Sequence, residues 1–308
     1  MKKKIIIIIS SILAFFLLLS IFIFRDNIFP HLTYSKSFWA FDTTISIKIY
    51  DEDNSKKYVE HIEEEFKELS NECDDYSGLL YELNQNREVD SKKYLADIIN
   101  NALILKEETN GYFNPFMGRI THLYKENIDS INDELIKNEL DIVNNSSVEI
   151  SGNHIKINGD ANIDLGAITK GYATKLAKEY LEENGIKKYL INSGESSISV
   201  GSKTHRIGLL KPLDTQRDYY AKIKLSNIGI STSAISYQKY HIISPKTGVQ
   251  ETYYQSISVI SDNDLKNDVY STAIFSMPED ELTSFANSKN IELYAYQGED
   301  NVKHIEKI

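Results

Sequence analysis

Two carboxylates, a lysine and a threonine in the second half of the chain have a spacing that suits the binding of charged groups. Asp164 stands at the start of a predicted helix, and Lys170 lies within its first two turns. A helix N-terminus presents free N–H groups and partial positive charge, so this segment is a candidate anion site. Asp268 and Thr272 would share one helix face. A carboxylate and a hydroxyl that converge suit a hard cation such as Mg²⁺.

A histidine begins a further candidate segment. His241 opens a predicted strand that runs into the turn Pro245–Gly248. An imidazole titrates at about pH 6.5, so a histidine beside a substrate can serve as a base. Each residue also has a simpler interpretation: the two carboxylates as helix caps, and the lysine and histidine as solvated surface residues.

The elements that would position these residues are helices and strands in irregular alternation. Hydrophobic periodicity predicts strands at 44–49, 189–191, 219–225, 241–244 and 256–260, a hairpin over 148–157, and helices at 56–69, 92–109, within 125–147, at 164–184 and from about 268. Antiparallel hairpins among helices indicate an α+β fold. Because no internal repeat or long linker interrupts it, we expect residues 38–308 to form one unit.

Composition narrows the classes of function. With 41% hydrophobic and 26% charged residues, the 308-residue chain is not disordered throughout. A net charge of −11 without clustered Lys and Arg argues against a nucleic-acid partner. The single cysteine, Cys73, excludes an intramolecular disulfide framework, and its acidic neighbours disfavour a thiolate.

The N-terminal residues have the pattern of a membrane anchor. A lysine-rich stub, 1–4, precedes the uncharged apolar run 5–24, and residues 25–37 read as a tether. Twenty apolar residues in a helix span about 30 Å, the thickness of the hydrocarbon core. The lysines place the stub in the cytoplasm and the rest outside. We therefore expect a single-pass plasma-membrane protein with one uncleaved transmembrane helix and an extracytoplasmic domain; a buried N-terminal helix is the alternative.

The candidate segments together resemble the FAD:protein FMN transferase family, also called the ApbE family. Residues 164–172 are similar to that family's Asp-Leu-Gly-Gly-Ile-Ala-Lys-Gly-Tyr, and 241–248 to its His-Ile-Ile-Asp-Pro-x-Thr-Gly. Residues 268–273 resemble its Asp-x-x-Ser-Thr-Ala helix start. Weaker similarities lie at Phe41–Thr44, Asp75–Ser77, Phe113–Gly118 and Asn192–Glu195.

The resemblance implies an ApbE-like mixed helix/sheet domain that takes FAD as substrate and Mg²⁺ as cofactor. Such an enzyme moves FMN onto a Thr or Ser hydroxyl of an acceptor protein and releases AMP. The residues that it implies in FAD binding are Phe41, Tyr76, Tyr112, Phe113, Asn114, Asp164, Lys170 and Ile242. It implies His241 as the catalytic base, and Ala167 (through its carbonyl), Asp268, Ser271 and Thr272 as metal ligands.

Two other functions fit the same residues. If water replaces the acceptor hydroxyl, the protein is an FAD pyrophosphatase that gives FMN and AMP. The chain also departs from the family pattern at Asn114, Glu195 and Ser244, which replace Asp, Gly and Asp. If those changes disable turnover, the protein is a non-catalytic extracytoplasmic flavin-binding protein. An Asp–Thr pair suited to a metal favours chemistry, because flavin binding alone does not require it.

Overall fold

An eight-stranded antiparallel sheet is the centre of the fold in the computed structural model, which describes residues 33–126, 128–236 and 240–307. The strand order is β1-β2-β6-β7-β10-β11-β12-β13. The strands are β1 (Thr33–Ala40), β2 (Thr43–Tyr50), β6 (Tyr189–Ser193), β7 (Ser197–Val200), β10 (Ile228–Ala234), β11 (Ser256–Ser261), β12 (Glu292–Gly298) and β13 (Asn301–Ile305). Every neighbouring pair is antiparallel, as the expected α+β class requires.

Alternation of apolar residues explains why β2 lies inside this sheet. Ile45, Ile47 and Ile49 are fully buried, whereas the residues between them are more accessible. The strand predicted at 44–49 is thereby confirmed. Its partner β1 begins at Thr33, so residues 33–37, which we expected to belong to the tether, are paired with β2 instead.

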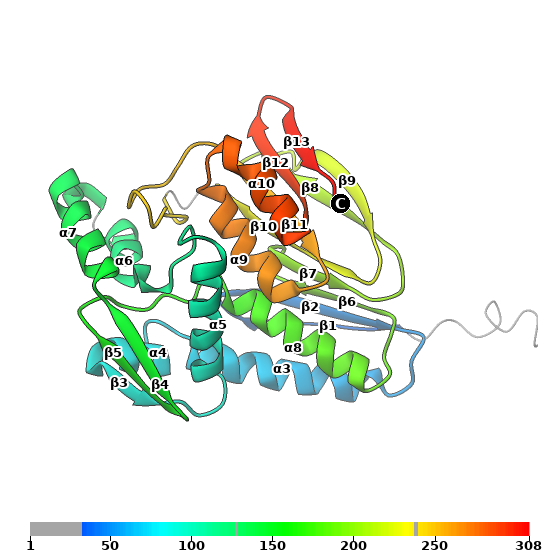
Figure 1. The fold of residues 1–308 in the computed structure, drawn as a ribbon. Helices are drawn as coiled ribbons and strands as arrows, with labels where there is room; N and C mark the ends of the chain where they lie inside the picture. The colour runs from blue at the N-terminus through cyan, green and yellow to red at the C-terminus, as the bar shows by residue number, and fades with distance from the viewer. Residues whose placement is uncertain (1–32, 127, 237–239, 308) are drawn as a thin grey trace, which may run out of the picture.

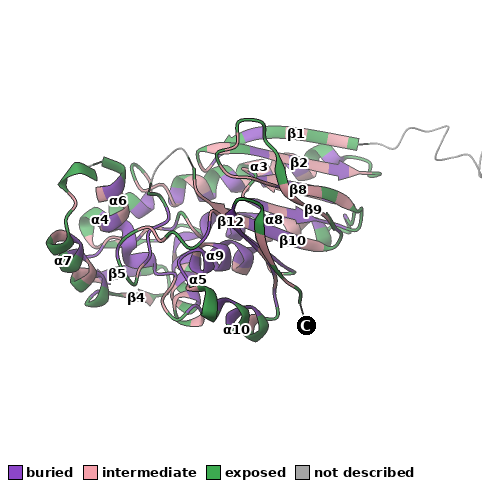
Figure 2. Cartoon of the chain, turned by 90° about the horizontal axis from the view of Figure 1, so that it is seen from above, coloured by how far each residue is buried: buried purple, intermediate pink, exposed green. Residues whose placement is uncertain are grey.

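Three long helices pack together against the sheet: α3 (Ser55–Glu72), α8 (Thr169–Glu183) and α9 (Asp264–Phe275) (Figure 1). Each confirms a predicted helix, although the starts differ. The helix predicted from Asp164 begins at Thr169, and the helix predicted from about Asp268 begins at Asp264. Nearly all of α9 is buried, as Figure 2 shows, so its polar residues lie inside the protein. Helix α10 (Glu279–Lys289) follows it.

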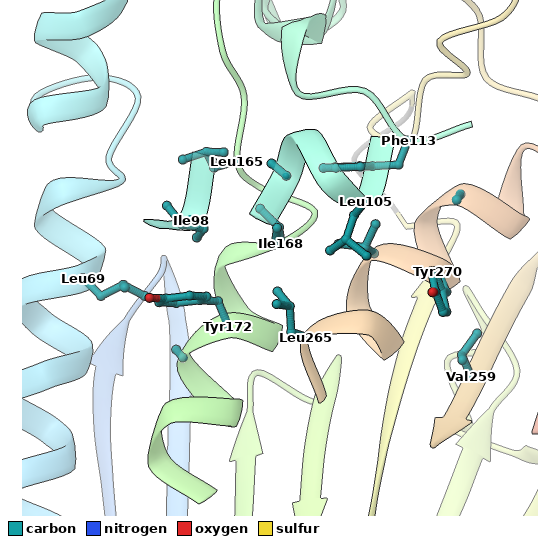
Figure 3. Close-up of a cluster of buried hydrophobic side chains, with 14 of the residues drawn as sticks. Leu69, Ile98, Leu105, Phe113, Leu165, Ile168, Tyr172, Val259, Leu265 and Tyr270 are labelled. Carbon is teal, nitrogen blue, oxygen red and sulfur yellow. The ribbon is translucent and has the colours of Figure 1, made fainter. Parts of the chain in front are cut away.

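A smaller group of elements lies beside these helices. It contains α4 (Leu79–Asn86), α5 (Leu95–Glu108), α6 (Gly118–Glu126), α7 (Asp133–Asn144), the short 3₁₀ helices η1 (Pro115–Met117) and η2 (Ile128–Ser130), and a sheet of β3 (Glu88–Asp90), β5 (His154–Asn158) and β4 (Ser147–Ser151). The predicted hairpin at 148–157 and the helix at 92–109 are confirmed as β4–β5 and α5. One hydrophobic core joins both parts, and Figure 3 shows its centre.

A separate two-stranded sheet pairs β8 (His205–Leu210) with β9 (Tyr219–Leu225). Its apolar residues form a second core cluster with β7, β10 and β11. The strand predicted at 219–225 is confirmed, as are those at 189–191 and 256–260. The strand predicted at 241–244 is wrong: residues 240–250 are irregular, with one turn at Pro245–Thr247.

The predicted membrane anchor, 5–24, lies outside the described residues. Across 33–126, 128–236 and 240–307, no helix is both long and apolar enough to cross a membrane.

Candidate functional site

A cavity of about 700 Å³ opens where α8, α9, the end of β10 and the β8–β9 sheet meet. Segments far apart in the sequence line it. Six of the residues singled out from the sequence lie on its wall: Ala167, Lys170, His241, Ile242, Asp268 and Thr272. The structure therefore brings the predicted base, one predicted cofactor-binding cation and most of the predicted metal ligands into one place.

The closest approach of α8 and α9 forms the floor of the site. The backbone N–H of Gly171 donates to Oδ2 of Asp268 over 2.8 Å. Gly171 is the third residue of α8, so its N–H belongs to the first turn, whose N–H groups have no partner within the helix, and Asp268 supplies one. A Cβ at Gly171 would lie 2.5 Å from Cβ of Asp268, which explains why glycine stands there.

Asp268 is not a helix cap. Helix α9 begins at Asp264, and its cap is Asn263, whose side chain accepts a hydrogen bond from the N–H of Lys266 over 3.0 Å. Asp268 lies a full turn further on and is only 5% exposed. Burial raises the pKa of its carboxyl group, and the charge of Lys170 opposes that shift. A buried carboxylate of this kind needs a cation nearby.

A group of hydroxyls stands beside this carboxylate. Oγ of Ser233, on β10, lies 2.9 Å from Oγ of Ser271 and 3.0 Å from Oγ1 of Thr272. Ser271 is fully buried, and its hydroxyl donates to the carbonyl of Asp268 over 2.9 Å. Ser271 does not line the cavity, whereas Ser233 does. Ser233 was missed in the sequence, because only the pairing of β10 with its neighbours brings it to α9.

The donor set fits a hard divalent cation such as Mg²⁺. The Asp268 carboxylate, the Thr272 hydroxyl and the Ala167 carbonyl are all oxygen ligands, which Mg²⁺ prefers. Within the described part of the chain, no three His, Cys, Asp or Glu side chains form a metal-binding group. The set therefore lacks the nitrogen and sulfur ligands typical of zinc. With a single carboxylate, the protein leaves much of the cation's charge for a bound anion to neutralise.

Positive side chains in the same cavity complete the electrostatics. Lys170 comes from the first turn of α8, and Arg206 and Arg217 come from the β8–β9 sheet and its connecting loop. Arg217 is paired with Glu195 over 3.1 Å. Both arginines were missed in the sequence, since nothing in their local pattern places that loop over the cavity. The cavity can thus hold an anion between a cation site and these side chains.

His241 faces this cavity from the irregular segment that precedes the Pro245–Gly248 turn. Its side chain is exposed, and its Nδ1 lies 3.3 Å from Oγ of Ser236. Ile242, by contrast, is only 7% exposed and covers the wall beside it. An accessible imidazole and a buried apolar side chain thus lie side by side on the cavity lining.

Six of the predicted FAD-binding residues lie outside the cavity lining, and four of them, Phe41, Tyr112, Phe113 and Asn114, make contacts elsewhere in the fold. Phe113 is in the hydrophobic core (Figure 3), and the Asn114 side chain accepts a hydrogen bond from the N–H of Phe116 to cap η1. Tyr112 donates to Glu281 over 3.0 Å. Phe41 sits in the β1–β2 turn, with φ of 53°, and its ring packs on α3. These contacts favour structural roles, and their predicted role with FAD stays a prediction.

Asp164 and Tyr76, also predicted to bind FAD, both contact side chains of α6. Asp164 precedes α8 by a turn: its Oδ1 accepts the N–H of Gly166, and its Oδ2 accepts the hydroxyl of Thr121, each over 2.7 Å. Asp164 is therefore not the first residue of the helix, as the sequence had suggested. The ring of Tyr76 is 54% exposed and stacks on His122. Neither Asp164 nor Tyr76 lines the cavity itself.

The fold is antiparallel α+β, and its cavity gathers oxygen donors beside cationic side chains, an arrangement that suits a phosphorylated ligand. The family model of the ApbE family matches residues 41–295, which is most of the chain, so the chain belongs to the ApbE family.

Related proteins agree with this assignment. The chain is 24% identical over 227 residues to an FAD:protein FMN transferase of Escherichia coli K12, a match that covers 65% of this chain and 64% of that relative. It is 30% identical over 125 residues to an FAD:protein FMN transferase of Klebsiella pneumoniae, with 37% of this chain covered. The matched region thus spans less than two thirds of the E. coli relative.

Solved structures show the same fold. The ApbE protein of Thermotoga maritima has a TM-score of 0.79 at 21% identity, and covers 89% of this chain and 97% of its own. The flavin transferase ApbE of Vibrio cholerae has a TM-score of 0.76 at 20% identity, and covers 90% and 97%. The expected ApbE-like mixed helix/sheet domain is confirmed at the level of the fold.

Proposed function

We propose that this protein transfers the FMN part of FAD to a Thr or Ser hydroxyl of an acceptor protein, in a reaction that requires Mg²⁺ and releases AMP. The observation that carries the proposal is the meeting of Lys170, His241, Asp268 and Thr272 on one cavity wall. Membership of the ApbE family and the names of the relatives support the choice of FAD as substrate.

The oxygen donors and the positively charged side chains of the cavity have different roles. Asp268, Thr272 and the Ala167 carbonyl would hold Mg²⁺, which would neutralise pyrophosphate charge when bound. Lys170 and Arg206 line the same cavity and bind the phosphates electrostatically. Transfer of a phosphoryl group depends mainly on positioning and charge neutralisation, so few further side chains are needed.

His241 acts on the acceptor. Its imidazole takes the proton of the acceptor hydroxyl as that oxygen attacks the FMN-side phosphorus. A new P–O bond forms to the acceptor, and the P–O bond to AMP breaks, so that the bridging oxygen leaves with AMP. Because His241 is exposed and lines the cavity, it can reach a hydroxyl carried by another protein.

We also propose that residues 5–24 anchor the protein in the plasma membrane, with residues 38–308 on the extracytoplasmic side. The support is the sequence: three lysines precede an uncharged run of membrane-spanning length. Fractionation of cells that make the full chain, with protease added outside, tests this. We expect the protein in membranes and open to protease; a secreted form that begins after residue 24 would show that the segment is cleaved.

The activity test uses the full chain in detergent with FAD, Mg²⁺ and protein fractions from the membrane or the extracellular medium. Flavin fluorescence on a denaturing gel reports covalent transfer, and chromatography reports AMP. We expect a fluorescent acceptor band and AMP together. FMN and AMP without a band would indicate the pyrophosphatase, and unchanged FAD bound to the protein would indicate a non-catalytic flavin-binding protein.

A further inference from the structure

Strand β10 extends further than its neighbour β7, and its last residues lie on the cavity wall. The pairing of β10 with β7 ends at Ser231, opposite Ser197. One further bond joins the two segments, since the N–H of Thr232 donates to the carbonyl of Ser196 over 2.7 Å. On its other side, β10 is paired with β11 as far as Ala234. Among the described strands, the end of β10 therefore has a neighbour on one side only.

The backbone groups of Ala234 face the side without a neighbour. In an antiparallel sheet, successive residues of an inner strand bond alternately to the strands on either side. Thr232 bonds toward β7, whereas the N–H of Ile235 donates to the carbonyl of Gln255, just before β11, over 2.9 Å. Ala234 lies two residues after Thr232, so its N–H and carbonyl point past the end of β7. Ala234 is only half-buried, so another molecule can reach these groups.

This open edge borders the groups that the proposed reaction uses. Ala234 itself lines the cavity. Its neighbour Ser233 has its hydroxyl 3.0 Å from Oγ1 of Thr272, in the cation site. Two residues further on, Oγ of Ser236 lies 3.3 Å from Nδ1 of His241. The backbone of Ala234 thus lies between a residue that contacts the cation site and a residue that contacts the proposed base.

The chemistry of this edge suits a polypeptide. An N–H and a carbonyl side by side are complementary to the carbonyl and N–H of another extended main chain, which adds to a sheet in this way. An ionised phosphate can accept from the N–H but has no donor for the carbonyl. The edge therefore favours a main chain over the phosphates of FAD.

We propose that the acceptor protein binds as a short extended segment, which pairs with Ala234 in line with β7. The inference rests on the proposed function, because it assumes that the acceptor is a protein. Successive side chains of an extended segment point to opposite faces of the sheet. Ser233 points to the face that carries α9 and the cation site. A segment paired beside it can direct a Thr or Ser hydroxyl to that same face.

Ala234→Pro tests this pairing. The change removes the N–H at the open edge and puts a ring in its place, whereas the bonds between β10 and β11 do not use that N–H. Loss of one main-chain hydrogen bond should lower kcat/KM for the acceptor about 2–10-fold. The ring should lower it further, because it blocks the approach of another strand.

The matched control is Ser37→Pro, on the edge strand β1. The N–H of Tyr50 donates to the carbonyl of Lys188, on the β6 side of β2, over 2.9 Å. By the same alternation, Ser46 of β2 bonds toward β6, so its partner Ser37 points its N–H away from the sheet. Ser37→Pro therefore removes an equivalent N–H that does not line the cavity.

Both variants are assayed as full chains in detergent, with FAD, Mg²⁺ and the protein fraction that gives the fluorescent band. FAD titration and thermal unfolding are measured alongside. We expect Ala234→Pro to lose transfer while it keeps its FAD affinity, and Ser37→Pro to match the parent protein. Parental transfer by Ala234→Pro would show that the acceptor does not use this edge. An equal loss of FAD affinity would assign the edge to FAD and overturn the proposal.

A second measurement leaves the protein unchanged. The peptide that carries the flavin is mapped in the labelled acceptor and synthesised with an N-methyl group at the hydroxyl-bearing residue or at either neighbour. Transfer should be slower to one of these peptides, since one N–H of the segment faces the Ala234 carbonyl. Equal rates for all of them would overturn the pairing, whatever the stability of Ala234→Pro. If the parent protein labels no acceptor in any fraction, it is the proposed function that fails.

Discussion

Gly171 and Asp268 join the two helices that form the floor of the site, because the N–H of the glycine donates to the carboxylate over 2.8 Å. The contact has two effects. It holds the one carboxylate of the predicted cation site against the start of α8, and it satisfies a first-turn N–H group that has no partner within that helix. A single hydrogen bond thus fixes the position of the Asp268 carboxylate.

Gly171→Ala tests this contact. The added Cβ would lie 2.5 Å from Cβ of Asp268 and 2.8 Å from the carbonyl of Asp264, so α8 and α9 have to move apart. Overpacking of this kind costs about 1–3 kcal/mol of the free energy of unfolding. Gly166→Ala is the control, since its Cβ would meet only the Asp164 carboxylate, at 3.1 Å. Thermal unfolding should show a lower midpoint for Gly171→Ala alone; equal midpoints would mean that the helices tolerate the side chain.

Asp268→Asn tests the cation site. The amide can still accept the Gly171 N–H, but it lacks the charge that attracts Mg²⁺, so Mg²⁺-dependent activity should be lost. Thr272→Ser keeps a hydroxyl and should keep most activity. Asn263→Ala removes the actual cap of α9, so it should lower the free energy of unfolding by about 1 kcal/mol. The Mg²⁺ concentration that gives half of the full activity should not change. An unchanged Mg²⁺ titration in Asp268→Asn would remove Asp268 from the cation site.

His241→Ala separates binding from transfer. Loss of a general base lowers the rate of transfer about 10²–10⁴-fold, whereas FAD should still bind because Lys170 and the cation ligands remain. The matched control is His304→Ala, another partly exposed histidine, whose Nε2 lies 3.0 Å from Glu292. Single-turnover transfer and FAD titration measure the two effects. Transfer at the parental rate by His241→Ala would assign the base to another residue.

The His122–Asp75 pair predicts a pH dependence of stability. The hydrogen bond that His122 donates to Asp75 raises the pKa of His122, with burial acting against it; Asp75, Lys125 and Asp164 are the charges that face it. Burial tends to raise the pKa of Asp75, but His122 and Lys125 hold it below its usual value. A histidine whose pKa is raised by folding stabilises the folded protein. This stabilisation is complete below the pKa of the histidine in the unfolded chain, about 6.5, and it is lost as the pH rises through the pKa of the histidine in the folded protein.

The parent protein should therefore unfold at a higher urea concentration than His122→Phe, and the difference between the two midpoints should be larger at pH 6 than at pH 9. Asp75→Asn should remove most of this pH dependence, because it removes the negative charge that stabilises the protonated imidazole. Urea unfolding at both pH values makes the comparison. A difference between parent and His122→Phe that grows toward pH 9 would contradict the direction of the His122 shift.

The sequence was informative where a residue's role depends on its own segment. The spacing of Asp268 and Thr272 in one helix, and the alternation of Ile45, Ile47 and Ile49, could be interpreted without tertiary structure. Both helix starts were misplaced because a turn of polar residues precedes each helix: Asp164 bonds to Gly166 there, and Asn263 supplies the cap that was assigned to Asp268.

Residues whose role depends on distant segments could not be found in this way. Ser233 reaches Thr272 only through the pairing of β10 in the sheet, and Arg206 reaches the cavity only because the β8–β9 sheet packs over it. Phe113 shows the reverse case. It stands in a segment that resembles the family's pattern, yet its ring lies in the hydrophobic core, because a buried phenylalanine and one that contacts a ligand look alike in sequence.

The most direct test of the proposed FMN transfer is the ratio of AMP released to flavin bound covalently to an acceptor protein, measured with FAD at several Mg²⁺ concentrations. We expect one AMP for each protein-bound FMN, with both products absent in EDTA and restored by Mg²⁺. The acceptor should gain the mass of FMN less one water, as a phosphoester on Thr or Ser requires. Release of AMP with free FMN and no labelled acceptor at any Mg²⁺ concentration would contradict it.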